Sequence, residues 1–384
     1  MVFRYGRRMP DTLVRRKFTV SGQVQGVGFR PFVYRIAADH ALTGTVSNTA
    51  AGVFIEVQGP PDAVDGFGYD LAHKLPPLAR VVSCLREDIP AAEGEDGFRI
   101  VASEAGAGGA GHQVLISADV ATCDDCLADM NDPAVRRHLY PFTNCTNCGP
   151  RYTITRFIPY DRDKTSMACF PLCPECAAEY ENPLDRRFHA QPNACPVCGP
   201  RVWFVDGAPQ GPTPDTAPDA GGLTGITAME SLSRALAEGR IAAVKGLGGF
   251  HLVCDAASSA AVAELRHRKH RPHKPLAIMV PDMDAARRIA CISPEEEALL
   301  TGRERPIVLC RALPGLAGGM PGWPDGQIVA PHDAPPISPL ISPDTPFVGI
   351  MLPYTPLHHV LLRLYRALLP EGRVPALVMT SGNA

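Results

Sequence analysis

The spacing of apolar and polar residues predicts a small α+β domain near the start of the chain. Alternation typical of strands occurs over 15–24, 43–59 (as a hairpin), 80–87 and 98–103, and helical spacing occurs over 31–42 and 61–75. The order β-α-β-β-α-β predicts a ferredoxin-like sandwich, with two helices on one antiparallel sheet.

A second folded region is indicated by the apolar pattern after residue 240. Residues 241–256 read as a buried strand, a glycine turn and another apolar run, and 258–269 has the character of a helix. An apolar strand pattern follows in 276–280, after a run of basic residues. These alternating elements predict an α/β domain.

Glycine and proline mark two connectors between the folded regions. Residues 104–112 contain almost no side chain able to pack, and 206–222 combines proline, glycine and alanine without a period. We therefore expect three domains, over 15–102, 117–205 and 224–384. A chain of 384 residues with 45% hydrophobic residues is long enough for several cores.

Composition narrows the class of protein. The net charge of −3 lacks the basic excess that binding to a nucleic acid backbone needs, so no nucleic acid partner is expected. No apolar run is long enough to span a membrane, and the basic N-terminus has no apolar signal region, so we expect a cytoplasmic protein. Thirteen cysteines in a reducing compartment indicate metal binding or catalysis before disulfides.

Eight cysteines form an internal repeat of four Cys-x2-Cys pairs. A shift of 50 residues superimposes Cys123 on Cys173, Pro133 on Pro183, and the CGPR sequence at 148–151 on that at 198–201. A duplication that preserves the spacing of cysteine pairs indicates two copies of one metal-binding unit. The eight cysteines are Cys123, Cys126, Cys145, Cys148, Cys173, Cys176, Cys195 and Cys198.

Two Cys-x2-Cys turns can close a tetrahedron of thiolates around one zinc ion. We therefore predict two structural zinc ions, since no ligand position remains open for catalysis. The repeat favours pairing of adjacent turns, although an interleaved arrangement satisfies the same chemistry. We expect the remaining cysteines to be ordinary buried residues; they are Cys84, Cys169, Cys254, Cys291 and Cys310.

A glycine-rich turn between the first strand and the first helix is a candidate anion site. Gly26 and Gly28 allow backbone N–H groups to converge, Arg30 stands at the start of the helix, and Pro31 suits its first position. The alternative is a tight turn with a surface arginine. Asn48, at the end of the second strand, is expected to reach the same place.

The sequences VQGVGFR (24–30) and GTVSN (44–48) resemble the acylphosphatase signature. That family hydrolyses acyl phosphates. The resemblance implies that Arg30 holds the phosphate and Asn48 orients the attacking water. Ala51 stands where many members have an acidic residue before the hairpin glycine.

A cluster of basic residues precedes the apolar strand at 276–280. Its charged members are Arg266, Arg268, Lys269, Arg271 and Lys274. Such a run is often only a solvated helix end. Pro272 and Pro275 stop the helix here, so we expect the charges to face a cleft and to bind a triphosphate.

Two short segments resemble the YrdC-like fold, which activates a one-carbon acid with ATP. They are K-x-R-P at 269–272 and T-S-x-N at 380–383, and VGIMLPYTPLHHVLL at 348–362 matches a third. The resemblance implies that Lys269 and Arg271 bind the phosphates. It implies that Thr380, Ser381 and Asn383 lie near the nucleotide. Met351 replaces an arginine of the tRNA-modifying branch, so the sub-family differs.

The complete order of segments resembles the HypF family of hydrogenase-maturation carbamoyltransferases. TCDDC (122–126), FHAQPNACPVCGP (188–200) and VKGLGGFHL (244–252) are close matches. The implied fold is an α+β multidomain protein: a ferredoxin-like acylphosphatase sandwich, two small four-cysteine zinc units and an α/β YrdC-like domain.

The same resemblance implies the chemistry. Carbamoyl phosphate is hydrolysed to carbamate, which ATP, with Mg²⁺, converts to carbamoyl-adenylate. The carbamoyl group then passes to the C-terminal cysteine of a HypE-type acceptor protein. Because the family's transfer domain follows this region, we expect a chain that ends at 384 to lack that last step.

Two other classes of protein fit the sequence less well. A zinc-containing RNA-binding or tRNA-modifying protein predicts a basic charge and no acyl-phosphate site, which does not fit this chain. A non-catalytic zinc scaffold leaves Arg30 and Asn48 without a purpose.

Overall fold

The computed structural model describes residues 13–49, 52–101, 114–207, 223–314, 316 and 336–383. The expected connector at 104–112, most of that at 206–222, and Ala51 lie outside the described residues. Contacts divide the chain into two compact units, Met1–Asp119 with Asn144–Gly199, and Val120–Thr143 with Pro200–Ala384. The domain boundaries expected from the connectors stay a prediction.

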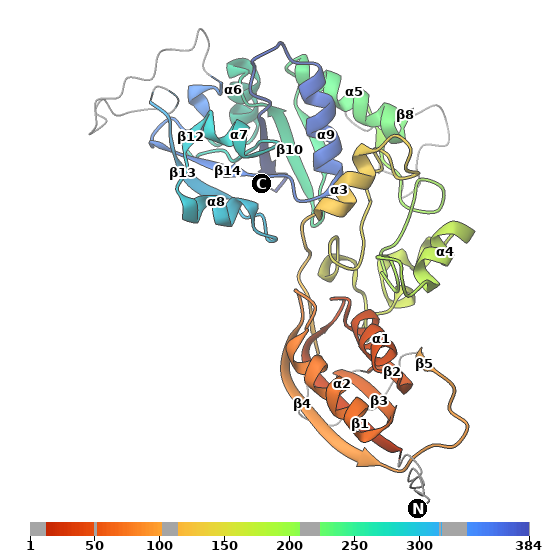
Figure 1. Cartoon of the computed structure of the whole chain (residues 1–384). Coiled ribbons are helices and arrows are strands. Elements are labelled where there is room, and N and C mark those ends of the chain that lie inside the picture. Colours follow the sequence, from red (N-terminus) through yellow and green to blue (C-terminus); the bar gives the residue numbers. More distant parts are fainter. Residues whose placement is uncertain are drawn as a thin grey trace, which may run out of the picture. The chain divides into compact units, whose positions relative to one another are not determined.

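The first unit contains the predicted ferredoxin-like sandwich (Figure 1). Its elements are β1 (Val14–Gln25), α1 (Phe29–Asp39), β2 (Thr43–Thr49), β3 (Gly52–Gly59), α2 (Pro61–His73), β4 (Arg80–Ile89), β5 (Phe98–Ile100) and β6 (Val114–Ile116). The strand order is β4-β1-β3-β2-β5, and β6 pairs with β1. The four long strands pair antiparallel, whereas β5 and β6 pair parallel to β2 and β1. The fold class expected from the sequence is confirmed here.

One apolar core lies between this sheet and its two helices. Val20, Ile55 and Phe67 are fully buried in it. The side chains come from alternate positions of β1 and β3 and from the inner faces of α1 and α2, as strand and helix periodicity require. The sandwich therefore fixes the turn between β1 and α1 on a rigid base.

The first unit also contains the second copy of the repeat and the segment that precedes it. The elements are η1 (Tyr152–Ile154), η2 (Arg162–Lys164), η3 (Ser166–Cys169) and α4 (Pro174–Glu181). The first copy contributes α3 (Asp124–Asn131) to the second unit. Both α3 and α4 span eight residues and have a cysteine at the N-cap, as duplicated units should.

The second unit is built on a mixed seven-stranded sheet of order β12-β13-β14-β11-β15-β10-β9. Its strands are β9 (Ala242–Lys245), β10 (Phe250–Asp255), β11 (Ile278–Met279), β12 (Ala290–Cys291), β13 (Val308–Ala312), β14 (Phe347–Met351) and β15 (Leu377–Ser381). A two-stranded ribbon joins β7 (Trp203–Phe204) to β8 (Leu223–Thr224). The helices are α5 (Gly225–Ala237), α6 (Ser259–Arg268), α7 (Met283–Arg287), α8 (Pro294–Thr301), α9 (Pro356–Ala367) and η4 (Pro339–Ile341).

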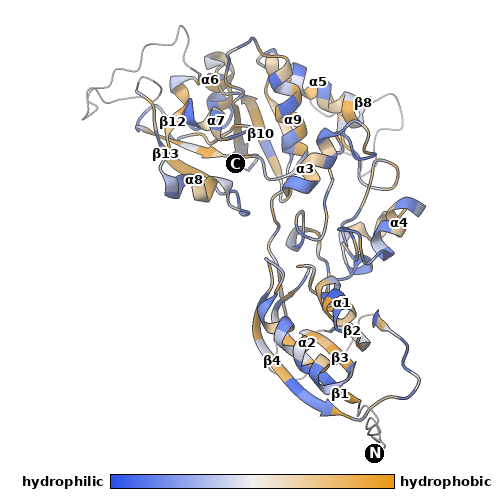
Figure 2. Cartoon of the chain, viewed as in Figure 1, coloured by the Kyte–Doolittle hydropathy of each residue, from blue (hydrophilic) through white to orange (hydrophobic). Residues whose placement is uncertain are grey.

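Helices cover both faces of this sheet, with one apolar core on each. Helices α6, α7 and α8 pack on the face that carries Ile278 and Val378. Helices α3, α5 and α9 pack on the face that carries Met279 and Met379. Neighbouring strand residues thus point into different cores, which explains the continuous apolar runs in the sequence. Figure 2 shows the mixed hydropathy of α9, whose apolar side faces the sheet.

Among the described residues, no helix combines the length and hydrophobicity needed to cross a membrane.

Candidate functional site

The turn between β1 and α1 has the geometry of an anion cradle. Gly26 and Gly28 both have φ of +72°, a left-handed conformation that favours glycine. Gly28 is also the N-cap of α1, and no side chain caps the helix there. The turn thus leaves the first backbone N–H groups of α1 for an anion. The helix begins at Phe29, so Pro31 occupies its third position instead of the predicted first.

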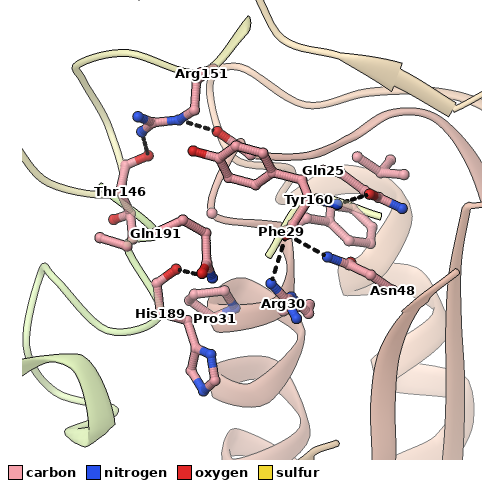
Figure 3. Close-up of a pocket in the computed structure, with 14 residues that line it drawn as sticks. Gln25, Phe29, Arg30, Pro31, Asn48, Thr146, Arg151, Tyr160, His189 and Gln191 are labelled. Atoms are coloured by element: carbon pink, nitrogen blue, oxygen red, sulfur yellow. Dashed lines mark hydrogen bonds between the residues drawn. The ribbon is translucent and has the colours of Figure 1, made fainter. Parts of the chain in front are cut away.

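Arg30 lies at the second position of α1 and is only 8% exposed. Its Nη2 atom forms an ion pair with Asp161 Oδ1 at 2.8 Å. The same nitrogen donates a longer hydrogen bond of 3.4 Å to the Tyr160 carbonyl oxygen (Figure 3). The alternative of a surface arginine on a tight turn does not fit this burial.

Asn48 is the next-to-last residue of β2 and lies beside the guanidinium of Arg30. In one orientation its amide nitrogen donates to the Tyr160 carbonyl oxygen at 3.3 Å. In the other, its amide oxygen accepts from Arg30 Nε and Nη2 at 3.2 Å each. The second orientation satisfies two donors of a buried cation and is the better one electrostatically. In both, Arg30 and Asn48 meet at one point.

Residues distant in the sequence complete the cradle. Tyr160 is 2% exposed, and burial raises the pKa of its phenol to about 12. Its ring covers Gly26, where a Cβ atom would contact the ring at 3.4 Å. Arg151 donates through Nε to the Gly26 carbonyl oxygen, which ties the turn to the second half of the unit. The pocket is lined by Val24, Gln25, Gly26, Gly28, Phe29, Arg30, Pro31, Asn48, Thr146, Arg151, Tyr160, His189, Ala190 and Gln191 (Figure 3).

His189 lines the cradle from the second copy of the repeat. Burial and the charge of Arg30 lower the pKa of its imidazole to about 4, with Asp161 acting in the opposite direction. His189 is therefore neutral at pH 7. Its backbone φ is +51°, and Leu139, its counterpart 50 residues earlier, has φ of +53°. The backbone conformation belongs to the repeat, whereas the side chain is specific to the second copy.

Sequence reasoning missed Tyr160, Asp161, His189 and Gln191 as site residues. His189 and Gln191 stand where the first copy of the repeat has Leu139 and Pro141. A comparison of the two copies could therefore have singled out these two positions. No such signal exists for Tyr160 and Asp161, which lie between the copies.

The eight repeated cysteines form two clusters of four. Cys123, Cys126, Cys145 and Cys148 make one set and Cys173, Cys176, Cys195 and Cys198 the other, with all sulfur atoms of a set within 4.8 Å of one another. The grouping is the one in which adjacent turns pair, and an interleaved arrangement is excluded.

The sulfur spacing fits zinc. A tetrahedron with Zn–S bonds of about 2.3 Å has an edge of about 3.8 Å. The Sγ atoms of Cys145 and Cys148 are 3.9 Å apart, and Cys195 Sγ lies 3.7 Å from the Sγ atoms of both Cys173 and Cys198. These separations are too long for disulfides, so each set suits one structural ion.

Two of the other cysteines are buried as expected, namely Cys254 and Cys310. The expectation was wrong for Cys84, Cys169 and Cys291, whose side chains are exposed. Cys84 and Cys291 lie on edge strands, β4 and β12, where one side of the strand has no neighbouring strand. An apolar pattern alone does not distinguish an edge strand from a central one.

The two segments predicted to bind the nucleotide meet at the end of α6. Lys269 Nζ donates to the carbonyl oxygens of Ser381 and Asn383 at 2.7 and 2.8 Å. Burial and the neighbouring charge of Arg271 lower the pKa of Lys269. Thr380 is 8% exposed and Ser381 is exposed. The K-x-R-P and T-S-x-N segments are therefore neighbours in space.

Arg266 does not share that role, contrary to the prediction that the whole basic cluster faces a cleft. It is 6% exposed, and its guanidinium donates to backbone carbonyl oxygens. The acceptors belong to Leu340, Ile341, Arg271, Pro272 and Lys274. Arg268 pairs instead with Glu264 at 2.6 Å on the exposed side of α6.

Three protein families match successive parts of the chain. The acylphosphatase family matches residues 16–100, the HypF finger family matches 122–155 and 172–205, and the Sua5/YciO/YrdC family, described as telomere recombination, matches 234–384. Together with the cradle and the two cysteine clusters, these matches define a multidomain protein that combines an acylphosphatase-like domain, HypF-type finger units and a Sua5/YciO/YrdC-like domain.

The chain belongs to the HypF carbamoyltransferase family. It is 46% identical to carbamoyltransferase HypF2 of Cupriavidus necator, over 98% of this chain and 43% of that protein. It is 44% identical to carbamoyltransferase HypF of Rhizobium leguminosarum bv. viciae, over the same shares.

A solved structure supports the same assignment. The structure of full-length HypF in the phosphate- and nucleotide-bound form is 37% identical, with a TM-score of 0.80, over 98% of this chain and 44% of that one. The chain thus spans less than half the length of these HypF relatives.

Proposed function

We propose that the chain carries the carbamoyl-activating steps of hydrogenase maturation. In the first step, water attacks carbamoyl phosphate, and carbamate and inorganic phosphate are released. The meeting of Arg30, Asn48 and the Gly26–Gly28 turn in one buried cradle carries this proposal. Arg30 and the helix N-terminus hold the phosphate, and Asn48 places the water.

In the second step, carbamate reacts with ATP to give carbamoyl-adenylate and pyrophosphate. The contacts of Lys269 with Ser381 and Asn383 support this assignment, because they join two segments that would hold a nucleotide. Arg271 would bind the phosphates together with Lys269, and Mg²⁺ would accompany the ATP. The carbamoyl group would then go to the C-terminal cysteine of a HypE-type partner, a step that rests on family membership.

Release of phosphate from carbamoyl phosphate tests the first step. The parent chain should release phosphate, and Arg30→Ala should slow the release by about 100- to 1000-fold, since the phosphate loses its buried cation. Arg35→Ala, which removes an exposed arginine from the same helix, is the matched control and should keep the parent rate. Equal rates for the parent and Arg30→Ala would reject the assignment.

A further inference from the structure

The segment between the two copies of the repeat places two acceptors beside the phosphate-binding arginine. Arg30 Nη2 contacts Asp161 Oδ1 at 2.8 Å and the Tyr160 carbonyl oxygen at 3.4 Å. An arginine has five N–H donors, so a bound phosphate can use the others while Asp161 keeps its place. The acceptors would then stand next to the phosphate, where the acyl part of an acyl phosphate has to lie.

This segment is fixed on the side of Tyr160. The Tyr160 N–H donates to Gln25 Oε1 at 3.0 Å. Gln25 is 1% exposed, and its Nε2 donates to the carbonyl oxygens of Thr49 and Gly52 at 2.8 and 3.0 Å. The sheet of the sandwich thus holds the Tyr160 backbone in register with the cradle.

A second anchor holds the segment after Asp161. The Arg162 guanidinium donates to the carbonyl oxygens of Gln191, Asn193 and Phe170 at 2.5, 2.9 and 2.7 Å. These acceptors belong to the second zinc unit and the chain leading into it. Asp161 therefore stands between two anchored residues, a preorganised arrangement that suits recognition better than a mobile lid does.

We propose that the Tyr160 carbonyl oxygen and the Asp161 carboxylate form the acyl subsite of the cradle, and that Asp161 selects carbamoyl phosphate by accepting an N–H bond from its amino group. This inference rests on the proposed hydrolysis of carbamoyl phosphate. The amino group is separated from phosphorus only by the bridging oxygen and the carbonyl carbon. Acetyl phosphate has the same shape but presents a methyl group, which leaves the acceptors without that donor.

The ratio of kcat/KM for carbamoyl phosphate to that for acetyl phosphate measures this contact. Any effect of Asp161 on phosphate binding, such as competition for Arg30, changes both values equally and cancels in the ratio. Asp161→Ala should lower the ratio by about 10- to 100-fold, the range expected for a hydrogen bond to a charged group. Asp163→Ala removes an exposed carboxylate two residues later and should leave the ratio unchanged.

Asp161→Asn tests whether a folding defect explains the result. The asparagine side chain keeps the shape of aspartate but loses its charge. It should lower the ratio in the same direction by a smaller factor. Zinc content and circular dichroism would establish that each variant is folded. Inhibition by inorganic phosphate would report the competition for Arg30 separately.

The outcomes separate this inference from the proposed function. A parent chain that hydrolyses carbamoyl phosphate, with an unchanged ratio in both Asp161 variants, overturns the inference and leaves the function standing. Parallel gains for both substrates with tighter phosphate inhibition also overturn it, because Asp161 would then only occupy Arg30. A parent chain inactive on carbamoyl phosphate overturns both.

Discussion

At the scale of single residues, the cradle depends on burial. Arg30 and Asn48 are 8% and 1% exposed, so their interaction takes place where water screens little. A charged guanidinium in such a place needs acceptors, and Asp161 and Tyr160 provide them. The residues that hold Arg30 are therefore part of the site.

Asn48→Ala should reduce turnover of carbamoyl phosphate more than it weakens binding. The proposed task of Asn48 is to place water, and misplacement of a reactant costs about 100-fold in rate. We expect kcat to fall by about that factor, with KM within a few-fold of the parent. Ser47→Ala is the control, because Ser47 is also buried but points to the other face of the sheet. Parent-like turnover in Asn48→Ala would remove Asn48 from the mechanism.

His189 should make folding stability sensitive to acid. Its pKa is about 4 in the folded chain, below the value of about 6.5 expected when unfolded, so the unfolded state binds the proton first. Stability should therefore fall as pH decreases from 6.5 towards 4. The groups that set this pKa are Arg30 and Asp161, besides burial itself.

Denaturant unfolding at pH 6.5 and 5 measures this effect. Between these values His189 should account for about 1–2 kcal/mol of lost stability. His189→Leu introduces the residue that the first copy of the repeat has at this position. This variant should lose less stability than the parent between pH 6.5 and pH 5. Zinc would be measured in the same samples, because thiolate protonation releases metal. An equal loss in both proteins would show that His189 is not the acid-sensitive group.

At the scale of elements, the duplication explains both what the sequence predicts and what it does not. The spacing of the cysteines predicts two clusters because each zinc unit is local, with its ligands within 26 residues of one another. The strand and helix order of the sandwich is likewise read from local periodicity. Arg30 and Tyr160 are 130 positions apart, so no local pattern indicates their contact. Arg266 presents a related difficulty. The sequence of a basic run does not show which of its cations is buried against backbone carbonyl oxygens.

The zinc units should lose their ions independently. The parent chain should contain two zinc ions, and Cys123→Ser and Cys173→Ser should each contain one, because a closed four-thiolate site tolerates no lost ligand. Each ion is expected to supply about 10–16 kcal/mol of apparent binding energy to its unit. Cys169→Ser, an exposed cysteine outside both clusters, should keep two. Elemental analysis that gives fewer than two ions in the undamaged parent would contradict the assignment.

At the scale of the whole molecule, the two proposed phosphate chemistries belong to different units. The cradle residues Arg30, Asn48, Tyr160 and Asp161 all lie in the first unit. Lys269 and its partners Ser381 and Asn383 all lie in the second. Each site is therefore assembled within one compact unit, so we expect damage to one set of contacts to leave the other intact.

Lys269→Ala should separate the two activities. The variant removes the cation that joins α6 to the last described residues, so pyrophosphate release with carbamoyl phosphate and ATP should fall by about 100-fold. Phosphate release from carbamoyl phosphate without ATP should stay within twofold of the parent, because Lys269 has no part in the cradle. Arg268→Ala removes an exposed cation of the same basic run, one that pairs with Glu264, and should preserve both products. Following both products in parallel decides the question: loss of both activities in Lys269→Ala would mean that the two chemistries share a site. A parent chain that releases phosphate but forms no pyrophosphate would contradict the nucleotide assignment alone.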